Sequence, residues 1–173
     1  MLTLQTLAAA ALISSSPLPA RAQSRTGDYK VSSPAAGTPV TYHEGPVLSN
    51  VNVVSVMWTG SVSSTVTSGV DGFYDALVHN SYLDWLSEYN TATQSIGRGS
   101  YQGNFTISPQ FTATTVPDAN IGAELAAQIN AGKLPTPTEN TLYMVHFPAS
   151  YTEVAPGGAV SCRDFCAYHY SST

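Results

Sequence analysis

Residues 51–58 read VNVVSVMW, and this stretch decides the fold of the chain. It is rich in β-branched valine, follows Asn50 and ends before Thr59-Gly60, which is typical of a β-strand between two turns. Apolar side chains occur at odd and even positions alike, so both faces of the strand are expected to be covered. The sequence therefore predicts a strand inside a sheet.

Two helices are predicted directly after this strand. The first has one apolar face with the spacing of an amphipathic helix. The residues of that face are Val66, Val70, Phe73 and Leu77. After a break at residues 79–81, a second helix is expected to end at Asn90. Its i,i+4 pairs are Tyr82/Leu86 and Trp85/Tyr89.

Three later segments complete the pattern of elements. A strand is predicted at residues 104–107, before Pro109, and another at residues 141–147. Between them, residues 117–131 predict a helix that has proline at its first position and stops at Gly132, with an apolar face formed by Ile121, Leu125 and Ile129. The order β-α-α-β-α-β indicates an α/β fold, a layered sandwich with helices packed on a mixed sheet.

The amino-terminal residues predict export from the cell. Residues 7–13 are apolar and are followed by a proline-containing break and Ala20-Arg21-Ala22, so residues 1–22 are expected to be a signal peptide. The apolar run is far shorter than the about 20 residues that cross a bilayer. Residues 23–40 show no apolar period and predict a flexible tail, which leaves residues 41–173 as a single domain.

The net charge of the chain limits the kinds of partner that it can bind. The formal net charge is -5, and loss of the signal peptide with Arg21 brings it near -6. A negative protein is repelled by phosphate backbones and by anionic membranes. We therefore expect neither nucleic acid nor a membrane as a partner of the secreted protein.

Cys162 and Cys166 are the only cysteines of the chain. In a protein bound for an oxidising compartment, the simplest interpretation is a disulfide between them. The alternative is zinc, because Cys162, Cys166 and His169 form a C-x3-C-x2-H cluster with Asp164 nearby. A fourth protein ligand is not identifiable, and no cofactor is predicted for the chain as it stands.

No complete catalytic motif is present, so catalytic residues remain unassigned. The sequence contains no G-x-S-x-G, and His43-Glu44 precedes Gly45-Pro46, which excludes the helical H-E-x-x-H arrangement. His146 lies in a predicted core strand, where a hydrogen-bonded structural histidine is expected. Carboxylate pairs on the predicted helices are expected to form a solvated face.

The aromatic residues permit a second type of site. Trp58 and Trp85, with the tyrosines, have the composition of a sugar-stacking surface, although their periodicity favours packing in the core. Asn104-Phe105-Thr106 is the one N-glycosylation sequon, and it would be used in a eukaryotic secretory route.

Three stretches give the chain a resemblance to a known family. They are residues 42–48 (YHEGPVL) with the valine-rich strand ending in Met57-Trp58, residues 121–129 leading to 142–145, and the loop at 162–169. In order and spacing they resemble the phosphate-induced protein 1 or EXORDIUM-like family of secreted proteins. The resemblance covers roughly residues 42–169.

The resemblance implies an extracellular or cell-wall-associated protein, linked in plants to growth and phosphate response. Its partners would be cell-wall polysaccharide or an extracellular protein. Members usually continue past the cysteine loop into a helix similar to those of zinc peptidases. We therefore expect residues 41–173 to be the amino-terminal part of such a domain, truncated at its carboxyl end.

Three functional hypotheses follow. The first is a secreted EXORDIUM-like protein without a complete catalytic site. The second is the amino-terminal part of a zinc-dependent, peptidase-like hydrolase, in which zinc belongs to a longer form. The third is a carbohydrate-binding module that uses exposed Trp or Tyr.

Overall fold

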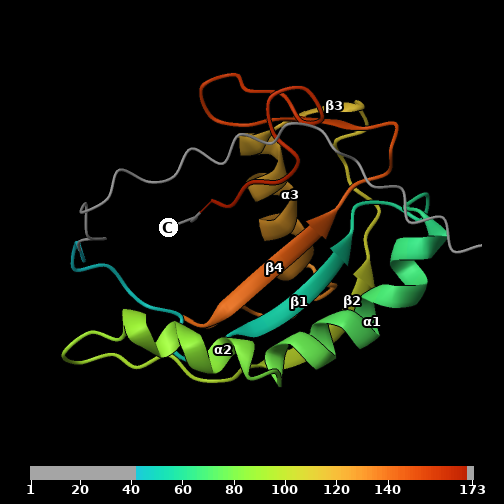
Figure 1. The fold of residues 1–173 in the computed structure, drawn as a ribbon. Coiled ribbons are helices and arrows are strands. Elements are labelled where there is room, and N and C mark those ends of the chain that lie inside the picture. The colour runs from blue at the N-terminus through green and yellow to red at the C-terminus, as the bar shows by residue number, and fades with distance from the viewer. Residues whose placement is uncertain (1–41, 171–173) are drawn as a thin grey trace, which may run out of the picture. The chain divides into compact units, whose positions relative to one another are not determined.

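The computed structural model describes residues 42–170, so the predicted signal peptide (1–22) and tail (23–40) lie outside the described residues. The chain is an α/β protein, as predicted (Figure 1). Its elements are β1 Asn52–Met57, α1 Ser64–Val78, α2 Tyr82–Trp85, the 3-10 helix η1 Leu86–Tyr89, β2 Ser100–Thr106, β3 Thr115–Pro117, α3 Asp118–Asn130, β4 Thr141–His146 and β5 Thr152–Val154.

The central sheet has the strand order β2-β1-β4, so β1 lies inside it, as its two apolar faces predicted. Both pairings in this sheet are parallel, and so is the pairing of β3 with β5. The sheet is thus parallel where a mixed one was expected. The reason is that a helix in each connection returns the chain to the edge where the previous strand began.

The two long helices cover opposite faces of the sheet. The chain steps from β1 to β2 on one side and then returns across β1 to β4 on the other. Because both crossovers are right-handed by preference, this reversal of direction places their helices on opposite faces. Accordingly, α1 packs on Val53 and Met57, whereas α3 packs on the alternate residues Val54 and Val56 (Figure 1).

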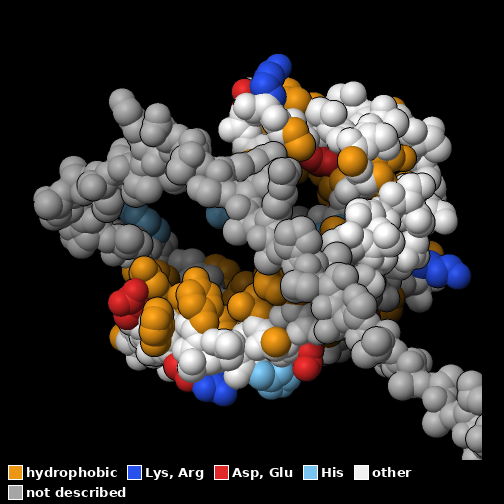
Figure 2. All heavy atoms as spheres, turned by 45° about the vertical axis from the view of Figure 1, so that its right-hand side comes forward, with side chains coloured by type: hydrophobic (Ala, Val, Ile, Leu, Met, Phe, Trp, Pro, Cys, Tyr) orange, Lys and Arg blue, Asp and Glu red, His pale blue; other side chains and the backbone are white. Residues whose placement is uncertain are grey.

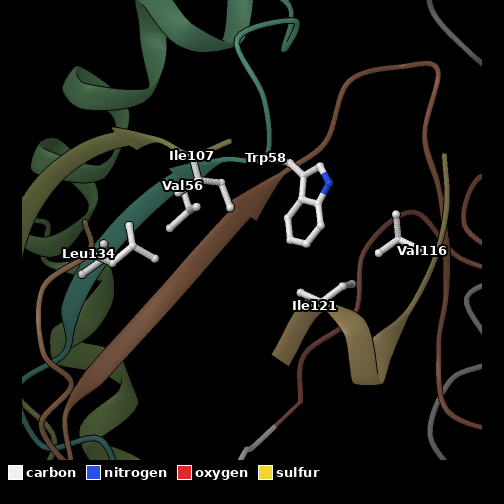
Figure 3. Packing of buried hydrophobic residues seen from close by; sticks show 7 residues of the cluster. Val56, Trp58, Ile107, Val116, Ile121 and Leu134 are labelled. Atoms are coloured by element: carbon white, nitrogen blue, oxygen red, sulfur yellow. The ribbon is translucent and has the colours of Figure 1, made fainter. Parts of the chain in front are cut away.

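The α3 face of the sheet is the larger closed core. Its buried residues come from five segments of the chain and are drawn in Figure 3: Val54, Val56, Trp58, Ile107, Val116, Ile121 and Leu134. Leu125 and Ile129 of α3 pack against them, which confirms the predicted apolar face of this helix. The Trp58 and Phe147 rings lie 4.8 Å apart between centroids, so the indole closes the end of the core.

On the other face, the buried side of α1 agrees with the predicted one except at Phe73. Val70 is buried as predicted, and Val66 and Leu77 pack half-buried against the same core, whereas Phe73 is 60% exposed. The prediction missed Tyr74, which is buried, because tyrosine was not counted among the apolar residues. Tyr74 is buried without loss because its hydroxyl lies 3.2 Å from Nε2 of His146 and has a hydrogen-bond partner there.

The short elements were not predicted. β3 and β5 have three residues each, too few for a period-2 pattern to stand out. The helix expected up to Asn90 is a four-residue α-helix that continues as η1. In residues 42–170, no helix is long and apolar enough to cross a membrane.

Candidate functional site

Three aromatic side chains stand out from the surface of α2 and η1. Trp85 is 75% exposed, Tyr82 53% and Tyr89 50%. The Tyr82 and Trp85 rings lie 6.4 Å apart between centroids, with their planes inclined by 54°. We call Tyr82, Trp85 and Tyr89 the α2 aromatic surface. The prediction of core packing is correct for Trp58, which is fully buried, and wrong for Trp85.

An ion pair holds α2 in place. Arg98, in the loop before β2, donates from Nε to Oδ1 of Asp84 at 2.9 Å and from Nη2 to Oδ2 at 2.7 Å. The same guanidinium donates from Nη1 to the carbonyl oxygen of His79 at 2.8 Å. Hydrogen bonding to Arg98 lowers the pKa of the Asp84 carboxyl, which therefore stays ionised. Leu83 is buried beneath the helix, so α2 is anchored from both sides.

The position of Arg98 depends on the glycine that follows it. Gly99 donates to the carbonyl oxygen of Val78 at 3.1 Å, and Ser100 donates to that of Val51 at 2.8 Å. A Cβ atom on Gly99 would collide with the backbone of Val51. Glycine at this position lets the loop run close to β1, and Arg98 then reaches both α1 and α2.

The chemistry of the α2 aromatic surface is that of stacking. The face of an aromatic ring carries a partial negative charge and attracts the weakly positive C–H groups of a sugar. Figure 2 shows hydrophobic side chains gathered over the part of the molecule that contains α1 and α2, with acidic, basic and histidine side chains at their margin. Such a surface suits a ligand with both apolar C–H faces and hydroxyl groups.

A second place of interest is the carboxyl end of the sheet, where parallel α/β folds commonly bind ligands. His146 ends β4 there and, with Tyr74, borders a shallow hollow of about 230 Å³. The other residues of the hollow lie on α1: Thr65, Val66, Gly69, Val70 and Phe73. Burial lowers the pKa of His146, and its ring pairs with Tyr74, as expected of a structural histidine.

The predicted cysteine site lies in a tight loop. Cys162 and Cys166 are both exposed and are free thiols in this structure, so the disulfide stays a prediction that the intact mass of the secreted protein tests. The loop already brings their neighbours together, because the Cys162 N–H donates to the Phe165 carbonyl at 2.8 Å. Cys162 itself adopts a positive φ of 61°.

The proposed metal ligands are not gathered into a site. Among residues 42–170, no three His, Cys, Asp or Glu side chains lie close enough to share a metal ion, and the set Cys162, Cys166 and His169 is included in that range. His169 is exposed, as is His43 near the start of the described chain. Asp164 instead pairs with Arg163 at 2.7 Å.

The predicted glycosylation site lies on a strand. Asn104 belongs to β2, an edge strand of the sheet, and is half-buried. Its Oδ1 atom is buried and has no hydrogen-bond partner in the part of the chain that the structure describes. Use of the sequon stays a prediction.

Sequence reasoning missed the residues that support the α2 aromatic surface. Asp84 and Arg98 are 14 positions apart and are joined only by the fold, so no local pattern indicates their pairing. The exposure of Trp85 had one signal in the sequence, the mostly polar residues 90–95 that follow the predicted helix. Comparisons of this chain with protein-family models, with curated proteins and with solved structures found no match.

Proposed function

We propose that this chain is a secreted extracellular or cell-wall-associated protein that binds polysaccharide and has no complete catalytic site. The observation that carries the proposal is Trp85, which is 75% exposed beside Tyr82 on a short helix. A large aromatic ring held in water costs free energy that a ligand recovers by covering it. The predicted signal peptide and the resemblance to EXORDIUM-like proteins support an extracellular setting.

The surface is prepared for binding because its support is rigid. Arg98 ties Asp84 of α2 to the end of α1, and buried Leu83 anchors the helix from below. A ring that is already in place loses little conformational entropy when a ligand covers it. The α2 aromatic surface therefore has the character of a binding platform.

The carboxylates near this surface support binding rather than hydrolysis. Glycosidases use two carboxyl groups on opposite sides of the scissile bond, about 5 to 10 Å apart. Residues 82–90 contain two carboxylates, Asp84 and Glu88, and Asp84 is engaged by Arg98 on both oxygens. This leaves Glu88 as a single acidic group beside the rings.

Retention on polysaccharide tests the proposal. The secreted protein is run on native gels that contain soluble polysaccharides, and it is mixed with insoluble wall polymers and sedimented. We expect Trp85→Ala to weaken retention at least about tenfold, which corresponds to about 1.4 kcal/mol of binding free energy. Thermal unfolding of the variant shows that it remains folded.

A matched control separates this surface from other exposed rings. Phe73 on α1 is 60% exposed and borders the hollow near His146 instead of α2. Phe73→Ala is expected to bind like the wild type. Absence of retention on every polymer, or equal losses in the two variants, would contradict the proposal.

The zinc-dependent hydrolase stays a separate prediction with its own measurement. Elemental analysis of the purified protein reports bound metal directly. Stoichiometric zinc would favour the hydrolase and direct attention to Cys162, Cys166, His169 and His146.

A further inference from the structure

We infer that the α2 aromatic surface takes a single, uncharged polysaccharide chain in solution, and neither an acidic polymer nor the flat face of a crystalline one. This inference rests on the proposed function and names the class of polysaccharide. Two independent observations carry it: the angle between the rings and the charges around them.

The ring angle excludes a flat ligand. The planes of Tyr82 and Trp85 are inclined by 54°, and their centroids lie 6.4 Å apart. The sugar faces on a crystalline polymer lie in one plane, so a crystal surface covers one of these rings and leaves the other tilted away. A single chain can turn between successive sugars and present a face to each ring. The geometry therefore matches one chain.

The support of α2 fixes the points from which both rings project. A rotation of the short helix would break the two hydrogen bonds between Arg98 and Asp84 and lift buried Leu83 from the core. Bidentate pairs of this kind are directional as well as attractive. The backbone that carries the two rings therefore stays in place when a ligand arrives.

The charges exclude acidic polymers such as polyuronates. Residues 82–90 contain Asp84 and Glu88 and no lysine or arginine. Arg98 is the neighbouring cation, and its guanidinium is already occupied by Asp84 and by the carbonyl of His79. A polyuronate would bring carboxylates beside Glu88, and residues 82–90 offer no cation to pair with them; the net charge of -5 adds to the repulsion.

The side chain of Glu88 can accept hydrogen bonds from a neutral sugar ligand. Glu88 lies three positions after Trp85 and next to Tyr89, and it is exposed. The adjacent Glu88 side chain raises the pKa of Tyr89, so the phenol keeps its proton. An ionised carboxylate accepts hydrogen bonds from sugar hydroxyls more strongly than a neutral acceptor does.

The test compares three classes of polymer at low ionic strength with one protein preparation. They are soluble neutral chains (mixed-linkage glucan, xyloglucan and galactomannan), soluble polygalacturonate, and crystalline cellulose. We expect the protein to bind at least one neutral chain and to show no retention on crystalline cellulose. Its affinity for polygalacturonate is expected to be at least about tenfold weaker, which corresponds to about 1.4 kcal/mol of binding free energy. Trp85→Ala is expected to remove the neutral binding.

A charge variant tests the electrostatic half of the inference. Glu88→Gln removes the charge and keeps an acceptor oxygen, so the ratio of polygalacturonate to neutral binding is expected to rise about twofold or more at about 0.01 M salt. Glu139→Gln, which removes an exposed carboxylate from the loop before β4, is the matched control and is expected to leave the ratio unchanged.

The outcomes separate this inference from the proposed function. Tighter binding to polygalacturonate, or Trp85-dependent retention on crystalline cellulose, would overturn the inference while polysaccharide binding itself stands. An unchanged ratio in Glu88→Gln would overturn the electrostatic argument. Failure to bind any of the three classes would overturn both the inference and the proposed function.

Discussion

The two tryptophans of this protein lie in opposite environments, although both were predicted to pack in the core. Trp58 follows β1, is fully buried and stacks near Phe147, whereas Trp85 on α2 is 75% exposed. The difference lies in what covers each ring. α3 and the segment around Val116 close over Trp58, and in residues 42–170 no element closes over Trp85. Burial of an aromatic residue is thus decided by its neighbours in space.

The two sides of the molecule also differ in how their charged side chains are paired. On the α3 side, the buried carboxylate of Glu124 accepts from the backbone of Gln110 and from Gln128 on the next turn of the same helix. On the α2 side, Arg98 and Asp84 are both about half exposed. The first arrangement stabilises the fold, whereas the second orients a surface in water, where an ion pair adds little to stability.

The largest expected effect is at Trp58. Trp58→Ala removes a fully buried indole from the α3 face, and we expect the free energy of unfolding to fall by about 3 to 5 kcal/mol. Urea unfolding followed by circular dichroism measures the change. A loss below about 1 kcal/mol would mean that the core around Trp58 is not closed and would break the comparison.

The next-largest loss of stability is expected on substitution of Glu124, which is 5% exposed on α3. Its Oε2 accepts from the Gln110 N–H at 2.9 Å, and its Oε1 accepts from Nε2 of Gln128 at 2.7 Å. Glu124→Ala removes the acceptor of the Gln110 N–H and the shorter of the two hydrogen bonds of Gln128, and it is expected to cost about 1 to 3 kcal/mol of unfolding free energy. Glu139→Ala, at an exposed position, serves as control and is expected to change stability by less than about 0.5 kcal/mol.

A smaller effect, visible in pH dependence, is expected at His146 on the α1 face. Burial lowers the pKa of this histidine in the folded state, so the unfolded chain binds its proton more readily. Stability from this group is fully present above the unfolded pKa of about 6.5 and is lost as the pH falls through the folded value. Unfolding free energy should therefore decline more steeply from pH 6.5 to 5 in the wild type than in His146→Gln. Parallel profiles would show that His146 titrates as it does in the unfolded chain.

The smallest effect on stability is expected at Trp85. Because its ring is mostly in water, Trp85→Ala should change the free energy of unfolding by less than about 0.5 kcal/mol, while polysaccharide binding is lost. The same urea titration measures it beside Trp58→Ala. A cost above about 2 kcal/mol would place Trp85 in a packed environment and remove the contrast between the two rings.

Much of the fold was predictable from local patterns. Residues 51–58 formed an interior strand as expected, and the apolar face of α3 was read correctly from Ile121, Leu125 and Ile129. These predictions succeeded because burial on one face imposes a period on the sequence, and burial on both faces of a strand imposes a continuous apolar run. The face of α1 was predicted correctly at Val66, Val70 and Leu77, but Tyr74 was missed because it becomes a core residue only when His146 supplies its hydrogen bond.

The sequence by itself determined the class of the fold, because strands and helices that alternate along a chain favour helices layered on a sheet. It also determined the low content of charged residues and the absence of a complete catalytic motif. Only the tertiary structure decided that the sheet is parallel, that Asp84 meets Arg98, and that Trp85 faces water while Trp58 does not. Pairing and burial depend on segments distant in the chain, and periodicity carries information only about neighbours along it.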